Sequence, residues 1–166
     1  MVNFTQPKMQ ILRRSLAVVM AVLCLAACNS GAPAVQLNSG QPAPTFQTFA
    51  ADGTPVHFPA AFVGKPLVIR FWADWCKYCE GEMKAIETVY QRHQGTGLQV
   101  LAVNAGQDKP AVVAFMKKIG VSYPALLDEQ SKIARSYGVV GLPTTFFVDA
   151  RGIVRGKIVG EADEAT

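Results

Sequence analysis

The chain has 166 residues, of which 50% are hydrophobic and 17% charged, a composition that suits one globular domain with an additional segment. Much of its net charge of +4 comes from Lys8, Arg13 and Arg14, which precede the first acidic residue, Asp52. The rest of the chain carries 13 basic and 12 acidic side chains without a basic stripe, so nucleic acid is not an expected partner.

Residues 1–27 have the features of a lipoprotein signal peptide. Basic residues precede an uncharged apolar run, residues 16–27, which is too short for a membrane-spanning helix of about 20 residues. Residues 25–28 (Leu-Ala-Ala-Cys) resemble the bacterial lipobox, and that resemblance implies that Cys28 is lipidated and becomes the first mature residue. An ordinary secretory signal with an incidental Cys28 is the alternative. We expect an extracytoplasmic lipoprotein that is held at the membrane.

The four cysteines divide into two groups. Cys24 lies inside the leader, and Cys28 is the expected lipid attachment point. Only Cys76 and Cys79 remain for the folded domain, and one pair is too few for a disulfide-stabilised scaffold.

Gly and Pro residues in 28–44 predict a flexible tether after the lipidated cysteine, and we assign residues 45–166 to the folded domain. Residues 45–49 and 56–58 flank Asp52-Gly53, which predicts a β-hairpin. The apolar run 66–72 predicts a strand buried on both faces.

The rest of the chain alternates between helical and strand patterns. A helix is expected from Cys76 to about residue 93, followed by a strand at 98–103. A helix from Pro110 to Gly120 carries Val113, Met116 and Ile119 on one side. The last predicted elements are a helix at 129–137 and strands at 144–148 and 153–159. This order predicts an α/β fold with a mixed sheet.

Cys76 and Cys79 lie between the strand at 66–72 and the helix that follows. A helix N-terminus stabilises a thiolate and can lower the pKa of Cys76 from ~8.5 towards ~7 or below. We expect Cys76 to be the exposed attacking thiol and Cys79 the buried resolving thiol. A structural disulfide and a zinc site are the alternatives, but His57 and His93 are not at zinc-ligand spacing.

Three groups of residues resemble the TlpA/ResA-like, thioredoxin-fold protein disulfide reductases. They are residues 70–79 with Glu82, residues 141–145, and the upstream segments 40–44, 52–53 and 64–66. The resemblance implies a thioredoxin fold, a mixed central sheet flanked by helices, with an N-terminal β-hairpin extension. It also implies that Pro143 is cis and packs against the cysteines, and that the backbone around Leu142 pairs with an extended client segment.

We expect Trp75, Leu142, Pro143 and Thr144 to bind the client. Family members commonly reduce cysteines of exported proteins, including apocytochromes awaiting haem. The expected partners are therefore such clients, a membrane electron donor and the membrane itself, and the expected state is a monomer without cofactor or metal. The family ends with a helix after the last strand, and that helix is expected to be missing from residues 160–166.

Several residues depart from the family pattern. Tyr78 and Lys84 replace prolines, and Arg70 stands where thioredoxins carry a buried acid. Arg70 and Lys77 favour the thiolate, which makes the disulfide more oxidising. Strand alternation places Arg70 and Trp72 on one face, so Arg70 lies either inside the protein near Cys79 or at the edge of the sheet.

Glu82 is the nearest plausible carboxylate for a buried Arg70, and it is also the candidate for proton transfer. The alternative for Glu82 is a solvated carboxylate in the first helical turn. The sequence thus predicts an extracytoplasmic thiol–disulfide oxidoreductase that acts as a reductase. A thiol peroxidase of the redoxin class and a metal- or haem-delivery chaperone are the alternatives.

Overall fold

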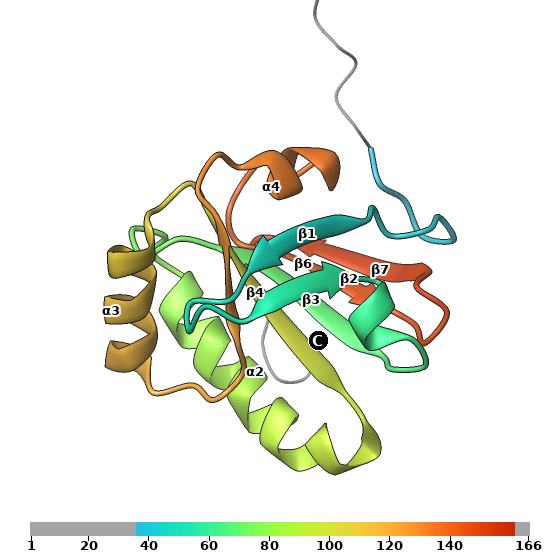
Figure 1. The fold of residues 1–166 in the computed structure, drawn as a ribbon, viewed down its shortest axis with the longest axis horizontal. Helices are drawn as coiled ribbons and strands as arrows, with labels where there is room; N and C mark the ends of the chain where they lie inside the picture. The colour runs from blue at the N-terminus through green and yellow to red at the C-terminus, as the bar shows by residue number, and fades with distance from the viewer. Residues whose placement is uncertain (1–35, 162–166) are drawn as a thin grey trace, which may run out of the picture. The chain divides into compact units, whose positions relative to one another are not determined.

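The computed structural model describes residues 36–161, so the leader and Cys28 lie outside the described residues (Figure 1). The strands are β1 (Phe46–Phe49), β2 (Pro55–Phe58), β3 (Leu67–Trp72), β4 (Gln99–Ala105), β5 (Ala125–Asp128), β6 (Thr144–Val148) and β7 (Val154–Val159). The α-helices are α2 (Cys79–His93), α3 (Lys109–Ile119) and α4 (Lys132–Ser136), and the 3-10 helices are η2 (Ala60–Phe62) and η3 (Gln94–Thr96).

Five strands form a sheet in the order β5-β4-β3-β6-β7, and its strand directions are mixed, as the sequence predicts. The strands β3, β4 and β5 are parallel, whereas β6 pairs antiparallel with β3 and β7. Parallel neighbours need crossover connections, and α2 and α3 provide them. The strands β1 and β2 form the separate antiparallel hairpin expected before the sheet. The fold class is thus confirmed.

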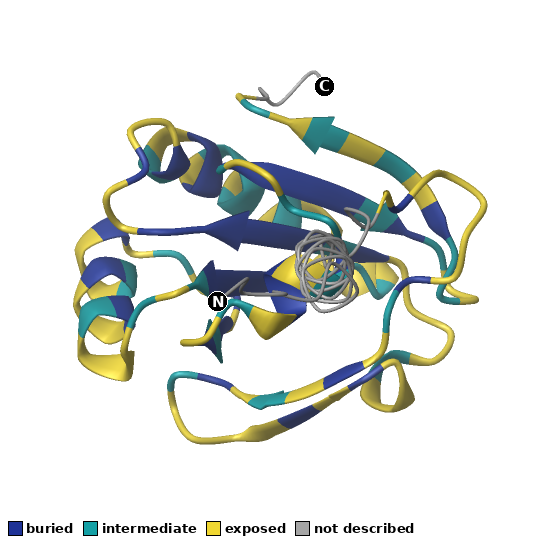
Figure 2. Ribbon diagram, turned by 90° about the horizontal axis from the view of Figure 1, so that it is seen from above, coloured by how far each residue is buried: buried dark blue, intermediate teal, exposed yellow. Residues whose placement is uncertain are grey.

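The two faces of the sheet bury different side chains because residues alternate along each strand. Ile69 and Phe71 of β3 pack with the hairpin and with Tyr137, which follows α4. Trp72 packs on the other face with residues of α2 and α3. Figure 2 shows the central strands as buried, whereas β7 alternates between exposed and half-buried residues. The centre of β3, which leads into the cysteine pair, is therefore enclosed on both sides.

The segment 37–43 is part of the folded domain, although the sequence places it in the tether. Its Leu37 and Ala43 side chains are 5% and 6% exposed. The Gly40 N–H donates to the Val154 carbonyl at 2.8 Å, and the Val154 N–H donates to the Gln41 carbonyl at 2.9 Å. The prediction for this part of the tether is therefore wrong, because backbone pairing with the start of β7 holds a segment that composition marks as loop.

The register of α3 also differs from the prediction. Asp108 caps the helix by accepting the Ala111 N–H at 3.0 Å, and Gly120 ends it in the left-handed region. The buried residues of α3 are Val112, Phe115 and Ile119, whereas Val113 is 42% exposed. The prediction that Val113 lies on the packed side of the helix is therefore wrong, because the adjacent residue Val112 is buried instead.

Two further elements differ in extent. The strand β5 is absent from the prediction. The helix α4 covers five residues rather than nine, because Asp128 at the end of β5 already accepts the Ile133 and Ala134 N–H groups at 3.1 and 2.8 Å. The Asp128 carboxylate thus binds N–H groups of the first helical turn, and the helix begins at Lys132 rather than at residue 129.

Candidate active site

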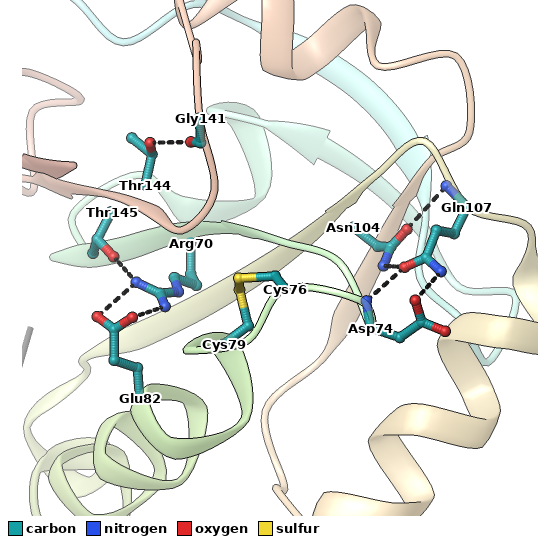
Figure 3. The surroundings of a disulfide bond; sticks show 10 residues. All are labelled: Arg70, Asp74, Cys76, Cys79, Glu82, Asn104, Gln107, Gly141, Thr144 and Thr145. Carbon is teal, nitrogen blue, oxygen red and sulfur yellow. Dashed lines mark hydrogen bonds and ion pairs between the residues drawn. A yellow bond between two sulfur atoms is a disulfide. The ribbon is translucent and has the colours of Figure 1, made fainter. Parts of the chain in front are cut away.

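Cys76 and Cys79 are joined by a disulfide where β3 leads into α2 (Figure 3). Their Cα atoms are 5.4 Å apart, and the Cys79 N–H donates to the Cys76 carbonyl at 3.1 Å. The helix begins at Cys79, three residues later than predicted, so Cys76 lies in the turn before it. This turn keeps Cys76 beside the positive end of the helix dipole without making it part of the helix.

The two cysteines differ in accessibility. Cys76 is 7% exposed and Cys79 is fully buried. Both belong to the core cluster of Trp72 and Met83, and Leu142 packs against that cluster. Cys76 is thus the more accessible residue of the pair, although it is less exposed than the sequence leads one to expect.

A network of polar side chains holds the loop that precedes Cys76 (Figure 3). Gln107 Oε1 accepts the Asp74 N–H at 2.8 Å and the Asn104 amide at 2.9 Å, and Gln107 Nε2 donates to Asp74 Oδ1 at 2.5 Å. Sequence reasoning missed Asn104 and Gln107. The available signal was a polar residue at the carboxyl end of a buried parallel strand, where binding sites of open α/β sheets gather.

The loop before β6 contains the cis proline that the family resemblance implies. The Leu142–Pro143 peptide bond is cis. The Pro143 carbonyl accepts the Gly160 N–H at 2.9 Å, and the Thr144 hydroxyl donates to the Gly141 carbonyl at 2.7 Å. Neither the N–H nor the C=O of Leu142 has a hydrogen-bond partner among residues 36–161. Thr144 is buried, and its hydroxyl holds the loop from inside.

Apolar side chains lie exposed on the two loops of the site. Trp75 is 70% exposed, Tyr78 46% and Val140 83%. Trp72 is fully buried instead, and its ring stacks on Phe115 with 4.8 Å between centroids. Of the two tryptophans, Trp72 therefore belongs to the core and Trp75 to the surface beside the disulfide.

A buried ion pair lies under the N-terminal turn of α2, and it places Arg70 inside the protein rather than at the edge of the sheet. Arg70 is fully buried and Glu82 is 4% exposed. Arg70 Nη1 donates to Glu82 Oε1 at 3.0 Å and to the Thr145 hydroxyl at 2.7 Å, and Nη2 binds Glu82 Oε2. Glu82 is thus not the solvated carboxylate of the alternative interpretation.

No group of three or more His, Cys, Asp or Glu side chains among residues 36–161 could hold a metal ion. None of the helices described there has the length and apolar character needed to cross a membrane.

Comparisons with known proteins agree with this geometry. The model of the AhpC/TSA family matches residues 39–157. The thiol–disulfide oxidoreductase ResA of Geobacillus thermodenitrificans is 37% identical over 121 residues, which are 73% of this chain and 69% of the relative. ResA of Bacillus subtilis is 32% identical over 129 residues, 78% and 72% of the two chains. A crystal structure described as thiol:disulfide interchange protein DsbE from Chlorobium tepidum is 28% identical, with a TM-score of 0.71, covering 75% of this chain and 87% of the other.

Proposed function

Because the chain belongs to the AhpC/TSA family, among its ResA-like thiol–disulfide oxidoreductases, we propose that it reduces disulfides of exported proteins outside the cytoplasm. The observation that best supports this proposal is the Cys76–Cys79 disulfide, in which the more accessible cysteine, Cys76, lies beside the N-terminus of α2. A dithiol at this position needs no bound cofactor for disulfide exchange.

Disulfide exchange transfers two electrons from the reduced protein to the client in two steps. In the reduced protein the Cys76 thiolate attacks one client sulfur, forming a mixed disulfide and releasing the other client sulfur as a thiolate. Cys79 then attacks the Cys76 sulfur, which forms the Cys76–Cys79 disulfide and releases the second client thiolate. Two electrons pass to the client, and its thiolates take up two protons. A dithiol donor at the membrane then returns two electrons to the protein.

The client is proposed to bind across the loop at Leu142 and Pro143. The unpaired Leu142 N–H and C=O can pair with an extended segment like an added strand. Trp75, Tyr78 and Val140 supply apolar contact around it. Because backbone pairing does not depend on side chains, clients need only an accessible cysteine in an extended segment. Apocytochromes are one such class.

Glu82 is our candidate for proton exchange with Cys79, since residues three apart on a helix are neighbours. Both Glu82 oxygens bind Arg70, and each has a second lone pair that can take part in the exchange. The membrane location rests on the leader, with Cys28 as the lipid attachment site. Two or more acyl chains there would hold the protein stably at the membrane.

Trapping of mixed disulfides tests the proposed chemistry. The Cys79→Ser variant should accumulate mixed disulfides with exported proteins through Cys76, whereas the matched Cys76→Ser variant should not. The reverse result would contradict the assignment of the attacking thiol.

The direction of exchange is tested by equilibrium with glutathione. A reductase should have a potential more negative than about −220 mV, whereas a value near about −120 mV is that of a strong oxidant and would contradict the reductase role. Rapid consumption of hydrogen peroxide by the reduced protein would support the thiol peroxidase instead. Metal or haem bound after purification would support the delivery chaperone.

A further inference from the structure

The ion pair of Arg70 and Glu82 joins three elements beneath the cysteine turn. Arg70 lies in the middle of β3, and Thr145 lies opposite it on β6. Glu82 lies one turn after Cys79 on α2, and side chains three positions apart on a helix have Cβ atoms about 5–6 Å from one another. The carboxylate that Arg70 binds is therefore a neighbour of the resolving cysteine (Figure 3).

Stabilisation of the fold does not account for the buried ion pair of Arg70 and Glu82. Transfer of two charges into the interior is unfavourable, and well-packed apolar residues often replace a buried ion pair without loss of stability. Arg70 Nε is also buried without a hydrogen-bond partner among the described residues, which adds to that cost. A fully buried guanidinium that is incompletely satisfied points to a role other than packing.

The other charged groups near the cysteines are solvated or bound elsewhere. Asp74 and Lys77 on the cysteine loop are exposed, and Asp74 is engaged by Gln107. Hydrogen bonds from Lys118 and then Lys84 lower the pKa of Glu80 to about 2, and all three groups lie at the surface side of α2. Water screens these charges, whereas the pair under α2 acts through the protein interior.

We propose that Arg70 is a positioning residue that sets the redox equilibrium of Cys76 and Cys79 by binding and offsetting the Glu82 carboxylate beneath them. Reduction of the disulfide adds two electrons, and a thiolate forms beside this pair. An uncompensated Glu82 carboxylate opposes that thiolate, whereas the Arg70 guanidinium favours it. Arg70 therefore stabilises the reduced protein and makes its disulfide a stronger oxidant. The inference deepens the proposed function, since it concerns the same cysteine pair.

The test is the redox equilibrium of the full-length protein with glutathione, in which protein disulfide and two glutathione molecules give the dithiol and glutathione disulfide. Arg70→Gln should shift the equilibrium constant about tenfold towards the protein disulfide, which is about 30 mV for this two-electron couple. Glu82→Gln should shift it severalfold towards the dithiol, because the guanidinium is then uncompensated. The double variant should lie between the two single variants.

A matched control removes an arginine from an ion pair at the surface. Arg155 binds Asp149 at 2.6 Å and is half exposed, so Arg155→Gln should leave the equilibrium within twofold of wild type. Ultraviolet titration of the thiolate gives a second measurement, and the pKa of the Cys76 thiol should be higher in Arg70→Gln. A purely structural role of Arg70 would not move the two glutathione equilibria in opposite directions.

The proposal is overturned if Arg70→Gln and Glu82→Gln shift the equilibrium in the same direction, or if both stay within twofold of wild type. If Arg70→Gln does not fold, Glu82→Gln alone tests the proposal. The proposal is then overturned if the glutathione equilibrium of Glu82→Gln shifts towards the protein disulfide or does not shift. A protein that shows these shifts with glutathione but reduces no client protein would contradict the proposed function and leave this inference standing.

Discussion

Gln107 connects the loop before Cys76 to the end of β4, and we predict that Gln107→Ala loosens the active site. The substitution removes three hydrogen bonds of the Gln107 side chain, two with Asp74 and one with Asn104. The loop that carries Trp75 and Cys76 would then lose its polar link to β4. The main-chain bond from the Gln107 N–H to Asn104 Oδ1 at 3.2 Å can remain.

The magnitude follows from the burial of each partner. The two bonds with Asp74 lie at the surface, and each is worth about 0.5 kcal/mol, the low end for a protein hydrogen bond. Asn104 is fully buried, and loss of the partner of its amide donor costs about 1–3 kcal/mol. The free energy of unfolding should therefore fall by about 2–4 kcal/mol.

Urea unfolding measures this change in the oxidised and in the reduced protein. The rate at which reduced Cys76 reacts with a small aromatic disulfide reports on the loop, and we expect it to change severalfold. Gln94→Ala is the matched control, because the Gln94 side chain is exposed and makes a bond only with Gln91 among the described residues. If Gln107→Ala matches this control within about 0.5 kcal/mol and reacts at the wild-type rate, the network does not support the site.

Three further predictions concern other parts of the chain. Cys28→Ala should release the protein from the membrane fraction, and mass spectrometry of the wild type should find an acylated N-terminal Cys28; an unmodified N-terminus elsewhere would contradict the anchor. Trp75→Ala should slow reduction of a protein client severalfold but leave the glutathione equilibrium within twofold, since this side chain is 70% exposed; equal losses in both assays would refute a client-binding role. The hydrogen bond from the Ile153 N–H is the main cause that lowers the pKa of Asp149 from 3.8 to about 2. The ionised Asp149 carboxylate therefore stabilises the fold fully above pH 3.8, and this contribution is lost as the pH falls towards 2. The difference in unfolding free energy between wild type and Asp149→Asn should narrow across that window in urea titrations, and a constant difference would argue against it.

Much of the site could be predicted because its signals are local. The apolar run of β3 and the period of two residues along it placed Arg70 and Trp72 on one face. A buried arginine requires a partner, and Glu82 was the carboxylate within reach on the following helix. The cis bond before Pro143 came from the resemblance to a family, since no local pattern distinguishes it from a trans proline at the start of a strand.

The missed features depend on contacts between distant segments. Gln107 meets Asp74 only because β3 and β4 pair in parallel with Trp72 opposite Asn104, a register that the sequence does not reveal. The packed side of α3 depends likewise on how the helix turns towards Trp72. The start of α2 differs because the Cys76–Cys79 turn closes before the helix begins, and helical periodicity does not separate the two.

The pairing of residues 37–43 with β7 changes how far the enzyme can work from a lipid anchor. If Cys28 carries the proposed acyl chains, nine residue steps separate the membrane attachment from Leu37, and a fully extended chain spans at most about 30 Å over that distance. A tether that ran free to residue 44 would reach nearly twice as far. Such a short tether would keep the domain near the membrane, so exported proteins would meet Cys76 close to the membrane that they have just crossed.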